Sequence, residues 1–231
     1  MPERIIHLSD SERVYVDRYP DACGVCHQKV YFSRPFSNAT RMNEESPGNV
    51  EVVFQCPALD CRHLLIAYYL VPSRRGPYQL SSIAPWRPTP ETFAAELVSV
   101  SPSFVEIYNE AKAAEEMKLL QIAGAGYRKA LEFLVKDFCI NEQPNDAKRT
   151  AEITRSSLMA VIQTHVRNTD IQAAASAERA AWLGNDETHY SRKWKGKDRD
   201  DLKALIAITV HSFTTALKLR GYMQQMPEGK K

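Results

Sequence analysis

Four cysteines stand in two close pairs, Cys23 with Cys26 and Cys56 with Cys61. A structural zinc site takes two thiolates from each of two tight turns and holds the ion in a tetrahedron. The first pair has two intervening residues and the second has four, so the second turn is slightly longer. We interpret the four cysteines as the ligands of one Zn2+ ion.

Histidines follow both pairs, and either His27 or His63 could replace Cys61 as the fourth ligand. Four thiolates already complete the shell, which favours histidines that lie beside the ion without binding it. A complete shell leaves no open position for a substrate, so the zinc is expected to stabilise a small domain and support a binding surface. The fifth cysteine, Cys139, stands alone in a helical pattern and is expected to be a small core residue.

Two polar pairs have helical spacing in the second half of the chain. Arg128 and Glu132 lie four apart beside an apolar stripe, which indicates half-buried side chains. Asn185 and His189 have the same spacing and share a face if a helix continues through them. The alternatives are an ordinary intrahelical ion pair for the first two and a helix-capping role for His189.

A basic run follows His189 in the order Arg192, Lys193, Trp194, Lys195, Gly196, Lys197. An aromatic ring between cations can stack on a base while the cations meet phosphates, which is typical of nucleic-acid binding. The alternative is a solvated loop, because Asp198, Asp200 and Asp201 follow directly and carry opposite charge.

Residues 101–111, 127–132 and 183–189 resemble, in order and separation, the family called domain of unknown function 4145, over roughly residues 101–222. Members of that family often carry an N-terminal zinc ribbon and stand alone in bacteria or phages, or are fused to restriction-enzyme subunits. The resemblance implies a role near anti-phage defence or nucleic-acid processing. The partner would be RNA, DNA or a defence-system protein.

That family is in turn similar to the HEPN helical bundles, many of which are dimeric, metal-independent ribonucleases. Their motif is an arginine followed after four to six residues by a histidine, and His189 and Asn185 occupy matching places. Trp182, Leu183 and Gly184 fill the possible positions of the arginine. The resemblance implies a homodimer, with His189 as general base and Asn185 orienting. Because Arg128 lies at the edge of an apolar stripe, our hypothesis is that Arg128, with Glu132 as support, replaces the missing charge. The missing arginine leaves open whether the chain is an enzyme or a non-catalytic module.

Local patterns indicate which elements position these residues. Alternating or β-branched runs at 12–19, 49–55 and 64–70 predict strands, and prolines between residues 71 and 102 predict a connector with a short helix over 92–97. Apolar stripes then predict about five helices, with breaks near Gly124, 141–146, Asn168 and 184–196.

The fold class is therefore α+β: a zinc ribbon over residues 1–80, a proline-rich connector over 81–102, and an all-α, HEPN-like bundle over 103–225. A net charge of +2 among 231 residues is too small to indicate a dedicated nucleic-acid or membrane binder, although it leaves room for a local basic patch. We expect no signal peptide and no membrane span, and the odd number of five cysteines indicates a reducing, cytoplasmic compartment. The leading function is a zinc-containing nucleic-acid- or protein-interaction module of prokaryotic or phage defence, with a metal-independent ribonuclease as the alternative.

Overall fold

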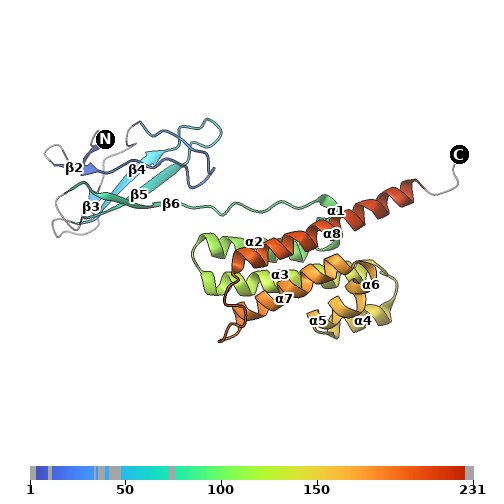
Figure 1. Ribbon diagram of the computed structural model, residues 1–231. Coiled ribbons are helices and arrows are strands. Elements are labelled where there is room, and N and C mark those ends of the chain that lie inside the picture. The colour runs from blue at the N-terminus through green and yellow to red at the C-terminus, as the bar shows by residue number, and fades with distance from the viewer. Residues whose placement is uncertain are drawn as a thin grey trace. The chain divides into compact units, whose positions relative to one another are not determined.

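The computed structural model describes residues 4–9, 12–33, 35, 40–41, 48–72 and 76–226. The chain divides into two compact units, Met1–Arg87 and Pro88–Lys231. The first contains strands and the second helices, so the predicted α+β class is confirmed (Figure 1).

The first unit contains two antiparallel sheets. A two-stranded sheet pairs β1 with β2, and a four-stranded sheet has the order β3-β4-β5-β6. The strands are β1 (Arg4–His7), β2 (Arg13–Val16), β3 (Thr40–Arg41), β4 (Val50–Gln55), β5 (Leu64–Leu70) and β6 (Gln79–Ala84).

Alternation of side chains explains the central strand pair. Val52 and Phe54 of β4 face Ala67 and Leu65 of β5, and all four are fully buried. The intervening residues point to the other face of the sheet, as the two-residue period of a strand requires. The strands predicted at 49–55 and 64–70 are present, and the one predicted at 12–19 is present over Arg13–Val16 only. β4 and β5 lead directly into and out of the second cysteine pair.

The boundary between the units lies after Arg87, beyond the predicted ribbon limit of 80. β6 continues to Ala84 because it pairs with β5, which places the first residues of the predicted connector in the ribbon. The predicted connector also contains a short helix, at Ala95–Val100.

The second unit is all-helical. Its elements are α1 (Ala95–Val100), α2 (Pro102–Glu116), α3 (Leu120–Asn141), α4 (Ala147–Arg155), α5 (Leu158–Val161), the π-helical turn η1 (Ile162–Val166), α6 (Arg167–Thr169), α7 (Ile171–Thr188) and α8 (Arg199–Gln225). The long helices α2, α3, α7 and α8 lie side by side, and α4 to α6 form a short-helix cluster at one end (Figure 1).

Small residues let the long helices approach closely. A Cβ atom on Gly126 of α3 would lie 2.8 Å from the Cβ atom of Ala111 of α2, so this contact needs glycine. In α7, five alanines are buried against the neighbouring helices: Ala173, Ala174, Ala177, Ala180 and Ala181. Larger rings fill the remaining space, including Phe138 and Phe213, which stack with centroids 3.8 Å apart. Cys139 is buried in this core, as expected.

Helix boundaries differ from the prediction in three places, one of which is the break expected over 184–196: α7 continues to Thr188, and α8 begins at Arg199. The break expected near Gly124 lies at 117–119, because Lys118 adopts a left-handed conformation with φ of 63° and turns the chain between α2 and α3. The stripe of Leu158, Ile162 and Val166 is buried but belongs to a short helix that continues as η1.

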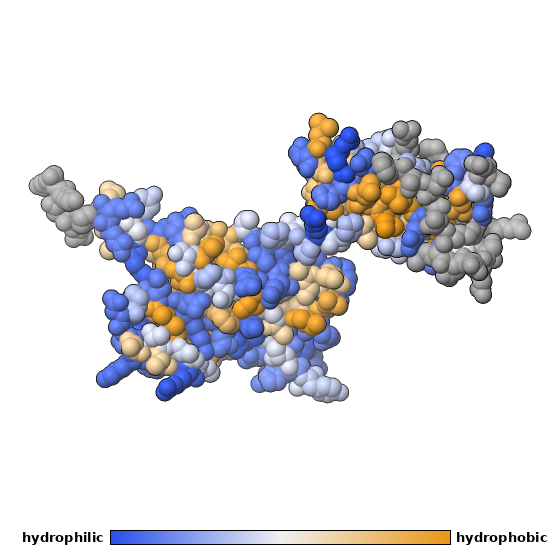
Figure 2. All heavy atoms as spheres, turned by 180° about the vertical axis from the view of Figure 1, so that it is seen from behind, coloured by the Kyte–Doolittle hydropathy of each residue, from blue (hydrophilic) through white to orange (hydrophobic). Residues whose placement is uncertain are grey.

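Among the described residues, α8 alone is long and apolar enough to span a membrane by length and composition. One face of α8 packs into the helical core through Leu202, Ile206 and Phe213. After Leu217 none of its described residues is buried, and its last turns run past the other helices (Figure 1). Apolar side chains also show between hydrophilic ones on the viewed face of each unit (Figure 2).

Candidate metal centre and helical site

The first cysteine turn is a tight loop closed by its backbone. The amide of His27 donates to the carbonyl of Cys23 at 2.9 Å, and His27 has a φ of 58°. The amide of Val25 donates to the Cys23 sulfur at 3.4 Å. Gly24 is required here because a Cβ atom would lie 2.6 Å from the carbonyl oxygen of Pro85. The segment after β6 therefore braces the turn.

The second cysteine turn connects β4 to β5. The amides of Cys61 and Arg62 both donate to the carbonyl of Ala58 at 3.1 Å, and Arg62 has a φ of 54°. The amide of Cys56 donates to the carbonyl of His63 at 2.9 Å, which closes the base of the loop. The two additional residues of this turn are thus absorbed by a hydrogen-bonded loop.

The two turns bring all four sulfurs together. The Sγ atoms of Cys23, Cys26, Cys56 and Cys61 all lie within 4.8 Å of one another. Cys23 and Cys61 are 3.7 Å apart, and Cys26 and Cys56 are 3.9 Å apart, so each short distance joins one turn to the other. A tetrahedron with metal–sulfur bonds of about 2.3 Å has sulfur–sulfur edges of about 3.8 Å. The four cysteines therefore fit one tetrahedral metal ion.

The neighbouring histidines are held by carbonyl groups. His63 Nδ1 lies 2.9 Å from the carbonyl oxygen of Cys61 and 3.5 Å from its sulfur. His27 Nε2 lies 2.7 Å from the carbonyl oxygen of Arg87. A ring nitrogen that donates to a carbonyl leaves only the other ring nitrogen able to bind a metal. The four sulfurs already complete a tetrahedron, which favours four thiolates with both histidines beside them.

Electrostatics indicates what the ion would contribute. Burial raises the pKa of Cys56 to about 12. Burial also acts to raise the pKa of Cys23, but backbone hydrogen bonds from Cys26 and Val25 outweigh it and lower that pKa. Four thiolates in contact repel one another, and a bound divalent cation would supply the compensating charge. With no open position, this centre would stabilise the ribbon.

In the helical unit, Arg128 of α3 reaches Asn185 of α7. Arg128 Nε donates to Asn185 Oδ1 at 3.1 Å, and Arg128 Nη1 contacts Glu132 Oε2 at 3.2 Å. Lys136 pairs with the other oxygen of Glu132 at 2.7 Å. Burial acts to raise the pKa of Glu132, but Lys136 and Arg128 outweigh it and lower the pKa. Three of the four polar residues predicted for the site are thus in direct contact.

Gly184 makes room for this arginine. A Cβ atom at Gly184 would lie 2.5 Å from Arg128 Cδ and 2.9 Å from its Cβ. The side chain of Arg128 therefore crosses α7 at Gly184.

His189 is the C-cap of α7, so the helix continues through Asn185 as the spacing required. Its exposed ring lines an open hollow of about 610 Å³ together with Asn185. Arg128 is not among the residues that line this hollow. The side-chain oxygen of Asn185 accepts from Arg128, and its backbone carbonyl accepts from the amide of His189 at 3.1 Å.

The basic run is folded against α7 by a residue that sequence reasoning missed. Asp186 is only 6% exposed, and its Oδ2 accepts hydrogen bonds from the amides of Lys193 and Trp194 at 2.8 and 2.6 Å. Trp194 then stacks on Trp182, with ring centroids 5.8 Å apart and planes 6° apart. The spacing of Trp182 and Asp186, four residues apart on one helix, was the available signal.

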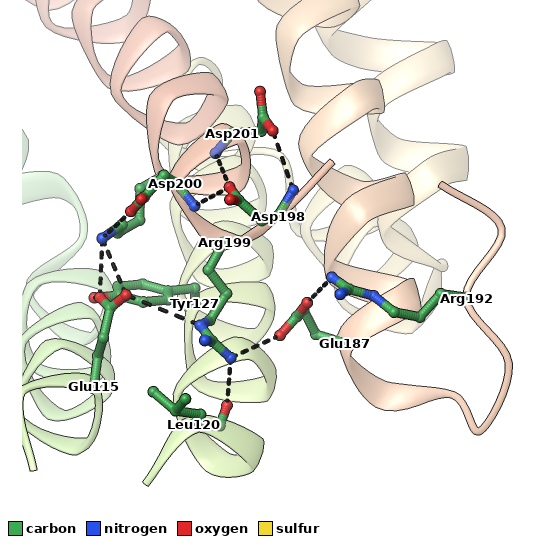
Figure 3. Close-up of polar contacts among 10 residues, drawn as sticks. Glu115, Leu120, Tyr127, Glu187, Arg192, Asp198, Arg199, Asp200 and Asp201 are labelled. Atoms are coloured by element: carbon green, nitrogen blue, oxygen red, sulfur yellow. Dashed lines mark hydrogen bonds and ion pairs between the residues drawn. The ribbon is translucent and has the colours of Figure 1, made fainter. Parts of the chain in front are cut away.

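A charge network holds the other side of this loop (Figure 3). Glu187 is 9% exposed and pairs with Arg192 of the loop and with Arg199 at the start of α8. Arg199 also donates to the carbonyl of Leu120 at 3.0 Å and lies 3.9 Å from Glu115. The network connects α2, α3, α7 and α8 and fixes both ends of the loop. Sequence reasoning did not find it because its members are far apart along the chain.

The chain was compared with known proteins, and no protein-family model, curated protein or solved structure matches it.

Proposed function

We propose that the chain is a zinc-containing interaction module that binds nucleic acid through the basic loop of its helical unit. The observation that carries the proposal is the folded state of this loop: Asp186 and Trp182 fix Trp194, which stays 45% exposed beside two lysines. A fixed, half-exposed aromatic ring among cations is what base stacking and phosphate binding need.

The acids that follow the loop cancel only part of its charge. Asp198 caps α8, Asp201 pairs with Lys197 at 2.8 Å, and Asp200 pairs with Lys203 at 2.8 Å. Within the described part of the chain, Lys193 and Lys195 have no acidic partner. These two lysines would meet phosphates, whereas Arg192 and Lys197 also hold the loop in place.

The remaining parts of the proposal have other grounds. The four-cysteine cluster supports zinc as the metal, because thiolate sets in tetrahedral arrangement favour this ion. Five free cysteines fit a reducing compartment, for which we propose the cytoplasm. The resemblance to domain of unknown function 4145 is the ground for a role in prokaryotic or phage defence and for a homodimer.

Retention assays test the proposed binding. The zinc-loaded chain is titrated against labelled single-stranded RNA, structured RNA, single-stranded DNA and duplex DNA, at several salt concentrations. Lys193→Glu combined with Lys195→Glu should weaken binding and flatten the salt dependence, because about two phosphate contacts are lost.

Lys148→Glu is the matched control, because Lys148 is an exposed lysine in the first turn of α4, away from the loop. It should bind as the parent does. Absence of binding to every nucleic acid would reject the proposal and direct the search to a defence-system protein.

A second candidate is a metal-independent ribonuclease, and one observation favours it. Arg128 crosses Gly184 and contacts Asn185, so an arginine lies near the place where the HEPN motif has one. His189 would act as general base and Arg128 would stabilise the phosphorane charge, with Glu132 supporting Arg128.

Incubation of labelled RNA with the chain and a chelator tests this candidate. Cleavage that persists with chelator and is lost in His189→Ala, while that variant still binds RNA, supports the enzyme. Intact RNA under all conditions rejects it and leaves the binding proposal unaffected.

A further inference from the structure

The stacked tryptophans of the helical unit are shared by two separate hollows. One hollow, of about 610 Å³, contains both rings with Asn185, His189 and Lys193. The other, of about 420 Å³, contains both rings with Arg179 of α7 and side chains of α8. Each volume lies in the range of small-molecule sites and is ample for one nucleobase.

The two hollows differ in chemistry. The first is lined by polar groups: the Asn185 amide, the His189 imidazole and the Lys193 ammonium can bond the edge of a base. The second is mainly apolar, with Leu205 and Ile208 forming part of its lining. An apolar hollow beside an indole ring holds a base through its π-face without reading its edge.

Cations accompany both hollows. The guanidinium of Arg179 lies 5.8 Å from the centre of the Trp182 ring and donates to the carbonyl of Ala175 at 2.8 Å. Among the residues the structure describes, no acid pairs with Arg179 or Lys193. The buried carboxylate of Asp186 is occupied by two backbone amides. Asp201, which lines the second hollow, is paired with Lys197. The charge that remains around the tryptophans is therefore that of Arg179 and Lys193, which complements a polyanion.

We propose that the Trp182–Trp194 pair is a stacking platform for a single-stranded nucleic acid, with successive bases in the two hollows. The inference rests on the proposed nucleic-acid binding and specifies its ligand. A duplex does not fit, because its bases expose only their edges and a π-face becomes available only when a base leaves the stack. Arg179 and Lys193 contact the phosphates on either side of the pair.

An aliphatic segment of a protein could also fill the second hollow, since Leu205 and Ile208 offer apolar contact. Such a segment would leave Arg179 and Lys193 without partners. The accessible charge therefore favours the nucleic acid over a protein segment or a second copy of this chain.

Tryptophan fluorescence tests the proposal directly. The chain has three tryptophans, so a Trp86→Phe version reports only on Trp182 and Trp194. It is titrated with a mononucleotide, a dinucleotide, a short single strand, the same strand without bases, and a hairpin duplex. We expect quenching by the dinucleotide and the single strand, weaker quenching by the mononucleotide, and none by the strand without bases.

Substitution separates stacking from phosphate contact. Trp194→Ala should weaken single-strand binding about 5- to 150-fold, from about 1 to 3 kcal/mol per stacked base. Trp194→Leu keeps an apolar side chain that can pack the loop but cannot stack on a base. A similar loss of single-strand affinity in this variant would assign the effect to stacking and not to loop packing. Arg179→Ala should weaken binding of the single strand. It should leave the stability of the helical unit unchanged, and thermal melting is measured in parallel to check this.

Failure of this inference and failure of the proposed function give different results. Tight binding of the duplex and of the strand without bases, with unchanged fluorescence, would overturn the stacking platform while nucleic-acid binding stands. No binding of any probe would reject both. Fluorescence that changes only with protein concentration would show a second copy in the hollows and would also overturn the inference.

Discussion

Removal of the Asp186 carboxylate should release the basic loop from α7. The side chain is 6% exposed, and one oxygen accepts both the Lys193 and the Trp194 amide. Hydrogen bonds to a charged group contribute about 1.5 to 3 kcal/mol each, and the stacked ring pair adds about 0.5 to 1.5 kcal/mol. Because an opened loop lets the amides bond to water, we expect Asp186→Ala to lower the free energy of unfolding by about 2 to 4 kcal/mol.

Two readouts distinguish loop release from general damage. Denaturant titration gives the free energy of unfolding of the helical unit, and collisional quenching by acrylamide reports the exposure of Trp194. Asp186→Asn keeps one carbonyl oxygen as acceptor, so its loss should be about half as large.

Glu152→Ala is the matched control, since Glu152 is an exposed carboxylate of α4 whose side chain has no partner among the described residues. It should change neither readout. Unchanged stability and unchanged quenching in Asp186→Ala would refute the reasoning, because the loop would then be held by other contacts.

Two further predictions concern the packing and the titration of the helical unit. Gly126→Ala should destabilise by about 1 to 2 kcal/mol in a thermal or denaturant melt, because overpacking against Ala111, 2.8 Å away, outweighs the gain in helix propensity. A Cβ atom at Gly221 would meet no atom within 4 Å, so Gly221→Ala should instead raise the free energy of unfolding by up to about 1 kcal/mol. Changes in stability of the same sign for both variants would contradict the close packing at Gly126. Burial raises the pKa of Asp137 above its ordinary 3.8. The stability that the protonated carboxyl gives the folded unit is therefore complete below pH 3.8 and is lost as pH rises through the folded-state pKa. In Asp137→Asn the side-chain carbonyl can still accept from Ser101, so this loss of stability with rising pH should disappear. Melts at acid and neutral pH measure the difference in stability between parent and variant. A parent that becomes more stable relative to the variant as pH rises would contradict the prediction.

Local patterns predicted the features that depend on neighbouring residues. The cysteine turns and the strands on either side of the second turn follow from spacing and alternation, since each is built from residues close in sequence. The contact of Arg128 with Asn185 joins residues 57 positions apart. The only sequence signal for this contact was Gly184, where the absence of a side chain leaves room for Arg128. A single glycine in a helical pattern has several possible explanations, so it could not predict the contact.

The loop shows why charge counts along the sequence misjudge a surface. The alternative for the basic run was neutralisation by Asp198, Asp200 and Asp201. Asp201 does pair with Lys197 of the run, but Asp198 caps α8 and Asp200 pairs with Lys203 of α8. Which partner an acid takes depends on how the chain turns, and here Asp186 sets that turn through two backbone hydrogen bonds. The end of the first unit also depends on a contact between segments apart in sequence. β6 pairs with β5, so this unit extends past the predicted limit of residue 80.

X-ray absorption at the zinc edge, combined with metal content per chain, tests the four-cysteine metal centre. We expect one zinc ion per chain with four sulfur neighbours at about 2.3 Å and no nitrogen neighbour, unchanged when His63 is replaced by alanine. A nitrogen neighbour that disappears in His63→Ala, or a folded ribbon that binds no metal, would contradict this expectation.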